Sequence, residues 1–187
     1  VELGVSLVGR PGPRCYYPCA LCALWMLRLG PQCPSMTWHT QSSFTHDAID
    51  RQMNSSETFS WLTGSEMGGW IRAFDWRRTP LGPIENWPAA LLSTLGVCLT
   101  AQYPMAIYWG SEGWLLYNDA WRPILGDKHP WALGRAAHEV WPELWDTISP
   151  LLHSVQTTGQ AVRRGDELLP MQRFGYTEEC YFDYSFN

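Results

Sequence analysis

The sequence predicts an α+β domain, and three observations support this fold class. Apolar residues recur at helical spacing in three segments, 67–74, 88–101 and 140–159. Strand-like segments occur as two pairs, each joined by a short glycine-containing turn. Of the 187 residues, 45% are hydrophobic and 17% are charged, which is typical of a chain that buries a core.

The segment 113–127 is the most informative part of the chain. Residues 114–117 form a short apolar run, as in a buried strand. Asn118 and Asp119 follow directly, and their side chains can accept hydrogen bonds from free N–H groups at a helix start, so we expect Asn118 to be a structural cap. Trp121, Ile124 and Leu125 then share one helical face before Gly126 ends the turn.

The segment before residue 105 predicts two helices. Met67, Trp70, Ile71 and Phe74 lie at the spacing of one helical face. A second helix is expected from Pro88 to about Ala101, because the fixed φ of proline suits a first helical turn. Its apolar stripe consists of Leu91, Leu92, Leu95, Cys98 and Leu99.

The remaining elements follow from periodicity and turn residues. Residues 105–109 and 114–117 predict an antiparallel hairpin. Residues 127–135 predict a loop, and residues 140–158 a long helix that bends at Pro150 and stops at Gly159. Two strands, 160–171 and 178–186, are expected to meet at a turn near Phe174 and Gly175, with strict alternation in the second.

Residues 1–52 differ from the rest, so we divide the chain into an N-terminal arm (1–52), a helical segment (53–101) and a sheet-containing domain (102–187). The arm is expected to be disordered or not part of the native protein, with Met53 as a candidate start. It carries a charge of +1 and residues 53–187 carry −6, consistent with the net charge of −5. The apolar run 20–29 is too short to span a bilayer, so no membrane span and a cytoplasmic location are expected.

Four of the six cysteines, Cys15, Cys19, Cys22 and Cys33, lie in the arm. The spacing of Cys15, Cys19 and Cys22 resembles the cluster loop of radical S-adenosylmethionine enzymes, and a zinc site with Cys33 or His39 is a second option. The β/α repeat of those enzymes and the paired zinc knuckles are both missing from the sequence. Chance clustering is therefore the preferred interpretation, with a metal or iron–sulfur protein as the weak alternative.

Composition argues against nucleic-acid binding. Lys128 is the single lysine, and the acidic part of the chain contains no basic stripe for phosphates. Ten of the twelve tryptophans lie between residues 61 and 145, as in a tightly packed small domain.

Five strings of residues resemble the N-terminal PAS sensor region of bacterial multidomain (hybrid) sensor histidine kinases. They are IRAFDW (71–76), TPLGPIENWP (79–88), LYNDA (116–120), ILGDKHPWALG (124–134) and EECYF (178–182). The resemblance covers about residues 64–187 and is specific for that subgroup, because long strings rich in Trp, Pro and Gly seldom match by chance.

The resemblance implies a PAS-like antiparallel sheet of five strands with helices on one face. It implies a sensory or dimerising input module of a two-component phosphorelay, itself without kinase activity, whose partners are downstream sensory and kinase domains of the same polypeptide and which can form a homodimer. In PAS domains the last strand lies in the middle of the sheet, and this chain ends before it. We therefore expect unpaired backbone groups on the two neighbouring strands.

No cofactor is predicted. A flavin photosensor of the light-oxygen-voltage type requires a reactive cysteine, and residues 120–135 contain none. A haem requires an axial histidine, and His153 falls beside the apolar stripe of its helix rather than in it.

No catalytic residues are predicted either. The candidate lining of a pocket for an unknown small ligand, between sheet and helices, is Tyr117, Trp121, Leu125, Trp145, Ile148 and Leu152. Core packing is the competing interpretation of these side chains. The functional alternative to a sensor is a structural dimerisation spacer that binds no ligand.

Overall fold

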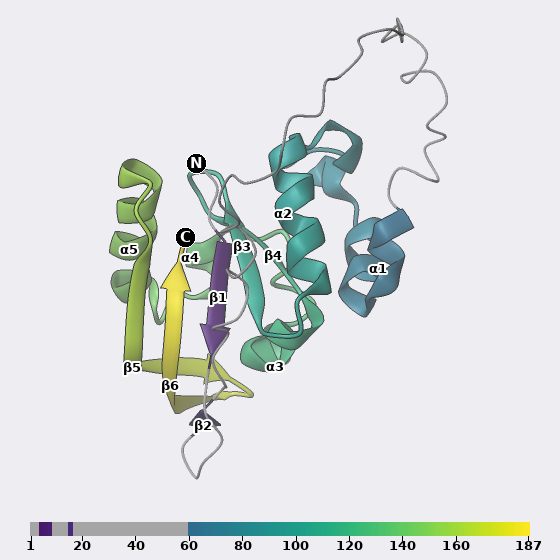
Figure 1. The fold of residues 1–187 in the computed structure, drawn as a ribbon. Coiled ribbons are helices and arrows are strands. Elements are labelled where there is room, and N and C mark those ends of the chain that lie inside the picture. The colour runs from purple at the N-terminus through teal and green to yellow at the C-terminus, as the bar shows by residue number, and fades with distance from the viewer. Residues whose placement is uncertain (1–3, 9–14, 17–59) are drawn as a thin grey trace, which may run out of the picture. The chain divides into compact units, whose positions relative to one another are not determined.

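The computed structural model describes residues 4–8, 15–16 and 60–187, and these residues have the predicted α+β organisation (Figure 1). Their helices are α1 (Glu66–Ala73), α2 (Ala89–Thr100), α3 (Arg122–Leu125), α4 (Ala137–Val140) and α5 (Trp145–Thr158). Their strands are β1 (Gly4–Val8), β2 (Cys15–Tyr16), β3 (Met105–Trp109), β4 (Trp114–Tyr117), β5 (Val162–Arg173) and β6 (Tyr176–Phe186). No helix in this part of the chain is both long and apolar enough to cross a membrane.

Helix α1 is capped by two side chains. Ser65 Oγ accepts a hydrogen bond from the Gly68 N–H at 2.9 Å, as a local N-cap does. Asp119 accepts the N–H groups of Glu66 and Met67 at 3.2 and 2.9 Å from more than fifty residues away. The turn after β4 therefore holds the start of α1 in place. The buried face of this helix is narrower than predicted, because Trp70 is 42% exposed.

The predicted hairpin of β3 and β4 is confirmed, with a register that runs from Ala106 opposite Tyr117 to Trp109 opposite Trp114. The outer edge of β4 is also paired. Leu115 donates to the carbonyl of Arg135 and accepts from the N–H of Gly134, both at 2.9 Å. The loop segment that contains Gly134 and Arg135 therefore lies alongside β4 and protects its edge.

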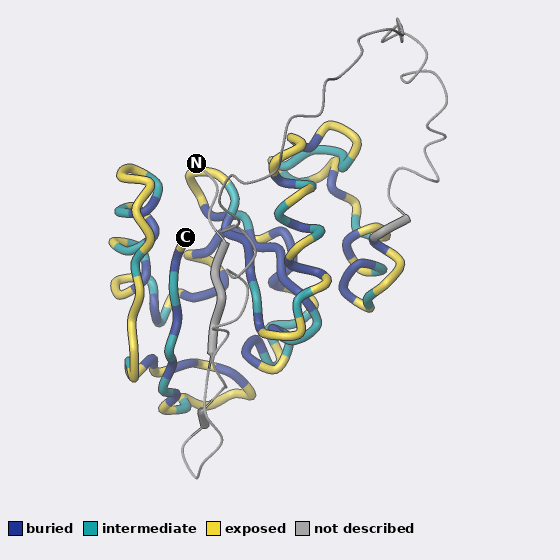
Figure 2. The backbone as a smooth tube through the Cα atoms, viewed as in Figure 1, coloured by how far each residue is buried: buried dark blue, intermediate teal, exposed yellow. Residues whose placement is uncertain are grey.

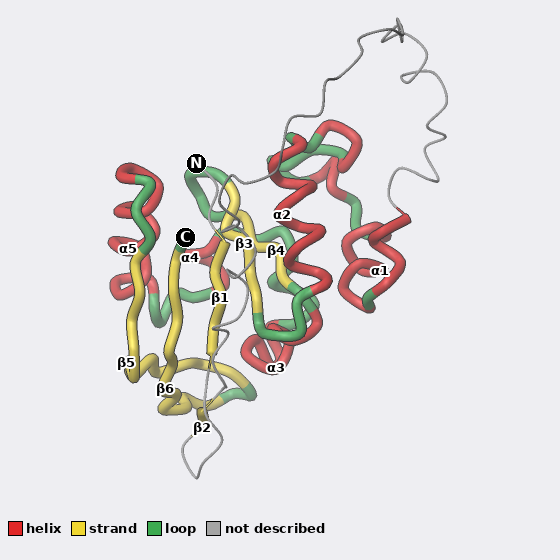
Figure 3. The backbone as a smooth tube through the Cα atoms, viewed as in Figure 1, coloured by secondary structure: helices red, strands yellow, loops and turns green. Residues whose placement is uncertain are grey.

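The predicted long helix corresponds to α5, which begins at Trp145, and a short break separates it from α4, which ends at Val140 (Figure 3). Trp141 has φ −123° and ψ 53°, outside the helical region. Pro142 explains this conformation, because the proline ring disfavours the helical conformation of the residue before it. The prediction of a continuous helix from residue 140 is therefore wrong. His138 lies in α4.

Strands β5 and β6 form the second antiparallel pair, aligned from Val162 opposite Phe186 to Arg173 opposite Tyr176. Their two-residue turn has positive φ at both Phe174 (57°) and Gly175 (77°), as in a type I′ hairpin. Along β6 the burial alternates, whereas most of β5 is exposed (Figure 2).

The pairs β3–β4 and β5–β6 are two separate ladders, and β1 pairs antiparallel with one strand of each. Val5 lies opposite Ala106 of β3 on one side and Phe186 of β6 on the other. Unpaired backbone groups on two neighbouring strands were expected at such a position. Here a segment of the supposed arm pairs with both strands. The proposed boundary at residue 53 lies outside the described residues.

Candidate ligand-binding cavity

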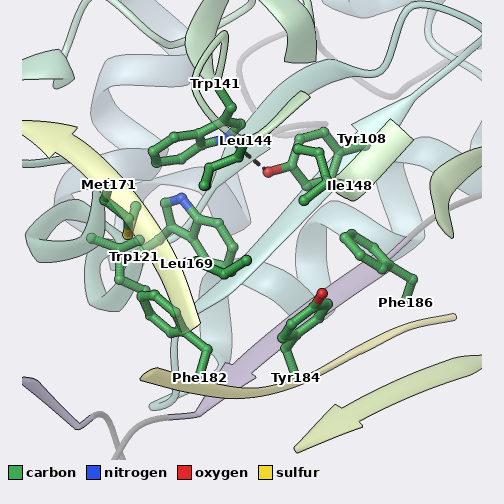
Figure 4. Close-up of a pocket in the computed structure, with 11 residues that line it drawn as sticks. Tyr108, Trp121, Trp141, Leu144, Ile148, Leu169, Met171, Phe182, Tyr184 and Phe186 are labelled. Carbon is green, nitrogen blue, oxygen red and sulfur yellow. Dashed lines mark hydrogen bonds between the residues drawn. The ribbon is translucent and has the colours of Figure 1, made fainter. Parts of the chain in front are cut away.

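A small apolar cavity lies between the strands β3, β5 and β6 and the segment that runs from the turn after β4 to α5 (Figure 4). Its volume is about 30 Å³. A single water needs roughly 10–15 Å³ of such volume, so the space is large enough for at least one water. The lining residues are Tyr108, Trp121, Ile124, Trp141, Leu144, Ile148, Leu169, Met171, Phe182, Tyr184 and Phe186.

Strand β6 supplies three of the aromatic walls. Phe182, Tyr184 and Phe186 alternate with more exposed residues, so all three point to the same face of the strand. The rings of Tyr184 and Phe186 pack edge-on, with their centroids 5.4 Å apart. The ring of Tyr108 in β3 makes a similar contact with that of Phe186, with a centroid distance of 6.3 Å. The two strand pairs therefore meet through aromatic side chains at this cavity.

Tyr108 and Trp141 form a buried polar pair in the wall. Trp141 Nε1 donates a hydrogen bond to the Tyr108 hydroxyl oxygen at 2.9 Å. Burial raises the pKa of Tyr108 well above its usual value. The hydroxyl therefore stays protonated at neutral pH and keeps one proton to donate.

Trp121 carries the unusual feature of the site. Its side chain is 1% exposed, and its Nε1–H has no hydrogen-bond partner among the described residues. A buried donor without an acceptor loses its hydration and gains nothing in exchange. A residue of the cavity wall therefore carries an unused hydrogen-bond donor in largely apolar surroundings.

The residues predicted to line a pocket separate into three groups. Trp121 and Ile148 line the cavity. Trp145 and Leu152 line a different surface depression, together with His153. Tyr117 and Leu125 are fully buried and line neither.

Tyr117 and Asn118 instead have structural hydrogen bonds. The Tyr117 hydroxyl lies 2.9 Å from Nδ1 of His129. Asn118 Oδ1 accepts the N–H of Trp121 at 3.1 Å, so this side chain caps the turn after β4.

Sequence reasoning missed nine of the lining residues, and one available signal would have found three of them. The alternation in β6 already places Phe182, Tyr184 and Phe186 on one face. Four others come from segments that are distant in the sequence, and no sequence pattern predicts that they lie together: Tyr108, Trp141, Leu169 and Met171. Ile124 was recognised only as a member of a helical apolar face, and Leu144 only as part of the predicted long helix at 140–158.

The described residues contain no group of three His, Cys, Asp or Glu side chains that could hold a metal. Cys15 lies in β2, and Cys19 and Cys22 lie outside the described residues. Cys98 and Cys180 are both buried; Cys180 Sγ accepts a hydrogen bond from Arg173 Nη2 at 3.4 Å, and burial raises the pKa of Cys98 to about 12. Cys98 is therefore a packed thiol rather than a reactive one. His153 is exposed on α5, away from the cavity lining.

No family model, curated protein or solved structure matches the chain. A function for this chain therefore has to come from its own residues and their geometry.

Proposed function

We propose that this chain is a PAS-type sensory input module of a multidomain bacterial histidine kinase, in which other domains carry the phosphotransfer. Two features support the proposal. The five sequence strings that resemble such sensor regions fall on α1, the α1–α2 connection, β4, α3 with its following loop, and β6. The order from α2 to β6 is helix, strand, strand, short helices, long helix, strand, strand, which is the order that the resemblance implies.

The single observation that carries the sensory function is the unpaired Trp121 N–H in the apolar cavity. A small neutral molecule with one acceptor atom would satisfy this donor, and its apolar part would contact the aromatic walls. A charged ligand would be disfavoured, because the lining contains no ionised group that could compensate its desolvation.

The size of the cavity gives a physical route from binding to signal. A space of about 30 Å³ is well below the roughly 150 Å³ of an apolar cavity that binds benzene, so an organic ligand of that size has to displace wall side chains. Those walls belong to both strand pairs and to α5. Because packed interiors are close to incompressible, displacement of the walls shifts the elements that carry them.

Two ketones of different size, acetone and cyclopentanone, test the proposal. Cyclopentane, which has the ring of cyclopentanone but no acceptor atom, is the control ligand. We expect saturable shifts of the Trp121 indole N–H resonance with the ketones and a rise in Tm. Trp121→Phe removes the donor and should weaken ketone binding about fivefold, the effect of roughly one hydrogen bond.

Trp70→Phe is the matched control, because it removes an indole N–H from an exposed ring of α1 that does not line the cavity. Ketone binding by this variant should equal that of the parent protein. An indole resonance of Trp121 that responds to no probe, in a protein without a co-purified small molecule, would contradict the proposal. That result would leave the dimerisation spacer as the better interpretation.

A further inference from the structure

A second, larger depression lies on the surface and shares no residue with the apolar cavity. It has a volume of about 480 Å³, within the range of small-molecule sites. The loop after α3, helix α4, the break before α5 and the β5–β6 turn surround it. We call it the acidic groove, and its lining includes Asp127, Lys128, Trp131, Glu139 and Glu143.

Both cations in the lining are already engaged by the protein itself. Lys128 Nζ donates to the Val140 carbonyl and to Glu143 Oε1, each at 2.7 Å. Arg173 is 3% exposed, and it donates to Glu178 at 2.5 Å and to the Pro123 carbonyl at 2.8 Å. Neither charge is presented to an incoming group, so the acidic groove is not an anion site.

The exposed groups of the acidic groove are carboxylates and aromatic rings. Asp127 and Glu139 are exposed acids. Trp131 is 48% exposed and Tyr176 is 56% exposed. Carboxylates beside accessible aromatic faces favour organic cations, through charge-assisted hydrogen bonds and cation–π contact. A metal ion is a poor alternative, since the described residues offer no metal-ligating group of three.

One guanidinium of the chain already uses part of this surface. Arg135 Cζ lies 4.9 Å above the Trp131 ring, and Arg135 Nη1 lies 3.4 Å from Glu139 Oε2. The Arg135 side chain is 47% exposed, so this contact is at the surface and easily exchanged. Arg135 therefore shows which chemistry the surface accepts, and it competes for the same ring and carboxylate.

Glu143 is an independent sign that a donor is missing. Its side chain is 8% exposed and lines the acidic groove. Oε1 accepts from Lys128 and from the Gln172 N–H at 2.9 Å, whereas Oε2 is buried with no hydrogen-bond partner among the described residues. An unpaired carboxylate oxygen in a buried position favours an additional N–H donor.

We propose that the acidic groove binds a guanidinium group, which stacks on Trp131 and donates to the carboxylates around it. A guanidinium fits better than an ammonium, because it is planar and presents several N–H donors in a fixed fork. The group could belong to a free small molecule or to an arginine side chain of a peptide, and two probes distinguish these sources.

The test is an NMR titration of the full chain with methylguanidinium. Binding is monitored through the resonances of the Trp131 indole N–H and the Gln172 backbone amide. N-methylurea, the neutral analogue of similar shape, is the control probe. We expect saturable shifts with methylguanidinium and none with N-methylurea. The blocked tripeptide acetyl-Gly-Arg-Gly-amide is the second probe: tighter binding than methylguanidinium indicates a peptide ligand, and equal or weaker binding indicates a free small molecule.

Three variants make the result specific. Glu139→Gln should weaken methylguanidinium binding about fivefold. Arg135→Ala should tighten it, since the internal competitor is gone. Glu85→Gln, at an exposed position outside the acidic groove, changes the net charge by the same amount and should have no effect. Equal responses to the cation and to N-methylurea, or equal weakening by Glu139→Gln and Glu85→Gln, would overturn the proposal.

Discussion

Asn118 shows how much one side chain can organise. Its Oδ1 accepts the N–H groups of Met105 and Trp121, both at 3.1 Å. Its Nδ2 donates to the carbonyls of Ala101 and Tyr103 at 3.0 and 2.7 Å. The residue is 1% exposed, and its two donors and two acceptor positions are all used. The amide therefore ties the turn after β4 to the connection between α2 and β3.

Replacement of Asn118 by Asp should destabilise the protein by about 3 kcal/mol at neutral pH, because a carboxylate would face two carbonyl oxygens in a buried site. The folded state would raise the pKa of the new carboxyl group, so the loss should shrink as the pH falls and the group becomes a donor. Urea unfolding at pH 7 and pH 4 measures both effects.

Asn86→Asp is the matched control, because Asn86 is exposed and the same chemical change there should alter the free energy of unfolding by less than about 0.5 kcal/mol. Similar losses in the two variants would show that the four hydrogen bonds of Asn118 do not cause the effect.

Arg173 is buried, and no pattern in the sequence predicts its burial. It lies at the end of β5, and its guanidinium reaches Glu178 of β6 and the carbonyls of Pro123 and Ile124 in α3. Gly126 closes the same region, since a Cβ at this position would lie 2.8 Å from the Phe174 ring and its φ is +58°. The carbonyls of Pro123 and Ile124 accept hydrogen bonds from this guanidinium and make its burial favourable.

At the level of elements, the loop after α3 is fastened to β4 by the Tyr117–His129 hydrogen bond. Desolvation, followed by the charge of Arg122, lowers the pKa of His129, and the carboxylates of Glu66 and Asp119 act against this shift. The ring is therefore favoured in its neutral form, in which Nδ1 can accept the hydroxyl proton of Tyr117.

A lowered pKa in the folded state has a defined consequence for stability. The unfolded chain binds a proton at His129 more readily, so the stabilisation is complete above the ordinary histidine pKa of about 6.5 and is lost as the pH falls through the folded value. We expect the free energy of unfolding to decrease from pH 7.5 to pH 5 more steeply in the parent protein than in His129→Gln. Parallel pH profiles for the two proteins would refute this account.

At the scale of the whole molecule, β1 joins two strand pairs that otherwise share no ladder. Val5 pairs with Ala106 of β3 and with Phe186 of β6. Tyr108 and Phe186, from the same two strands, contact each other in the cavity wall. Residues 4–8 therefore connect the two halves of the candidate site through the backbone.

Val5→Pro tests this connection, because proline removes one N–H and fixes φ in the middle of a doubly paired strand. Hydrogen exchange should become at least tenfold faster at the amides of β3 and of residues 183–186 that face β1. The amides of Leu115 and Leu116 in β4 are the internal control and should exchange at the parent rate. Unchanged protection at residues 106–107 and 183–186 would show that β1 does not pair there in solution.

The sequence predicted most elements, because their determinants are local. The α+β class, the two hairpins, the turn at Phe174 and Gly175 and the cap at Asn118 all follow from spacing and turn chemistry within a few residues. The wrong start of the long helix has a local cause as well, because Pro142 disfavours the helical conformation at Trp141 and α5 begins only at Trp145.

The tertiary structure alone decided the contacts between distant segments. Asp119 caps a helix more than fifty residues earlier, Trp141 meets Tyr108 across thirty-three residues, and β1 pairs with strands from the middle and the end of the chain. A local pattern reports which face of an element is apolar, and many partners can cover such a face equally well. Which partner covers it depends on the packing and hydrogen bonding of the whole fold, and those contacts also place Trp121 beside the cavity without an acceptor.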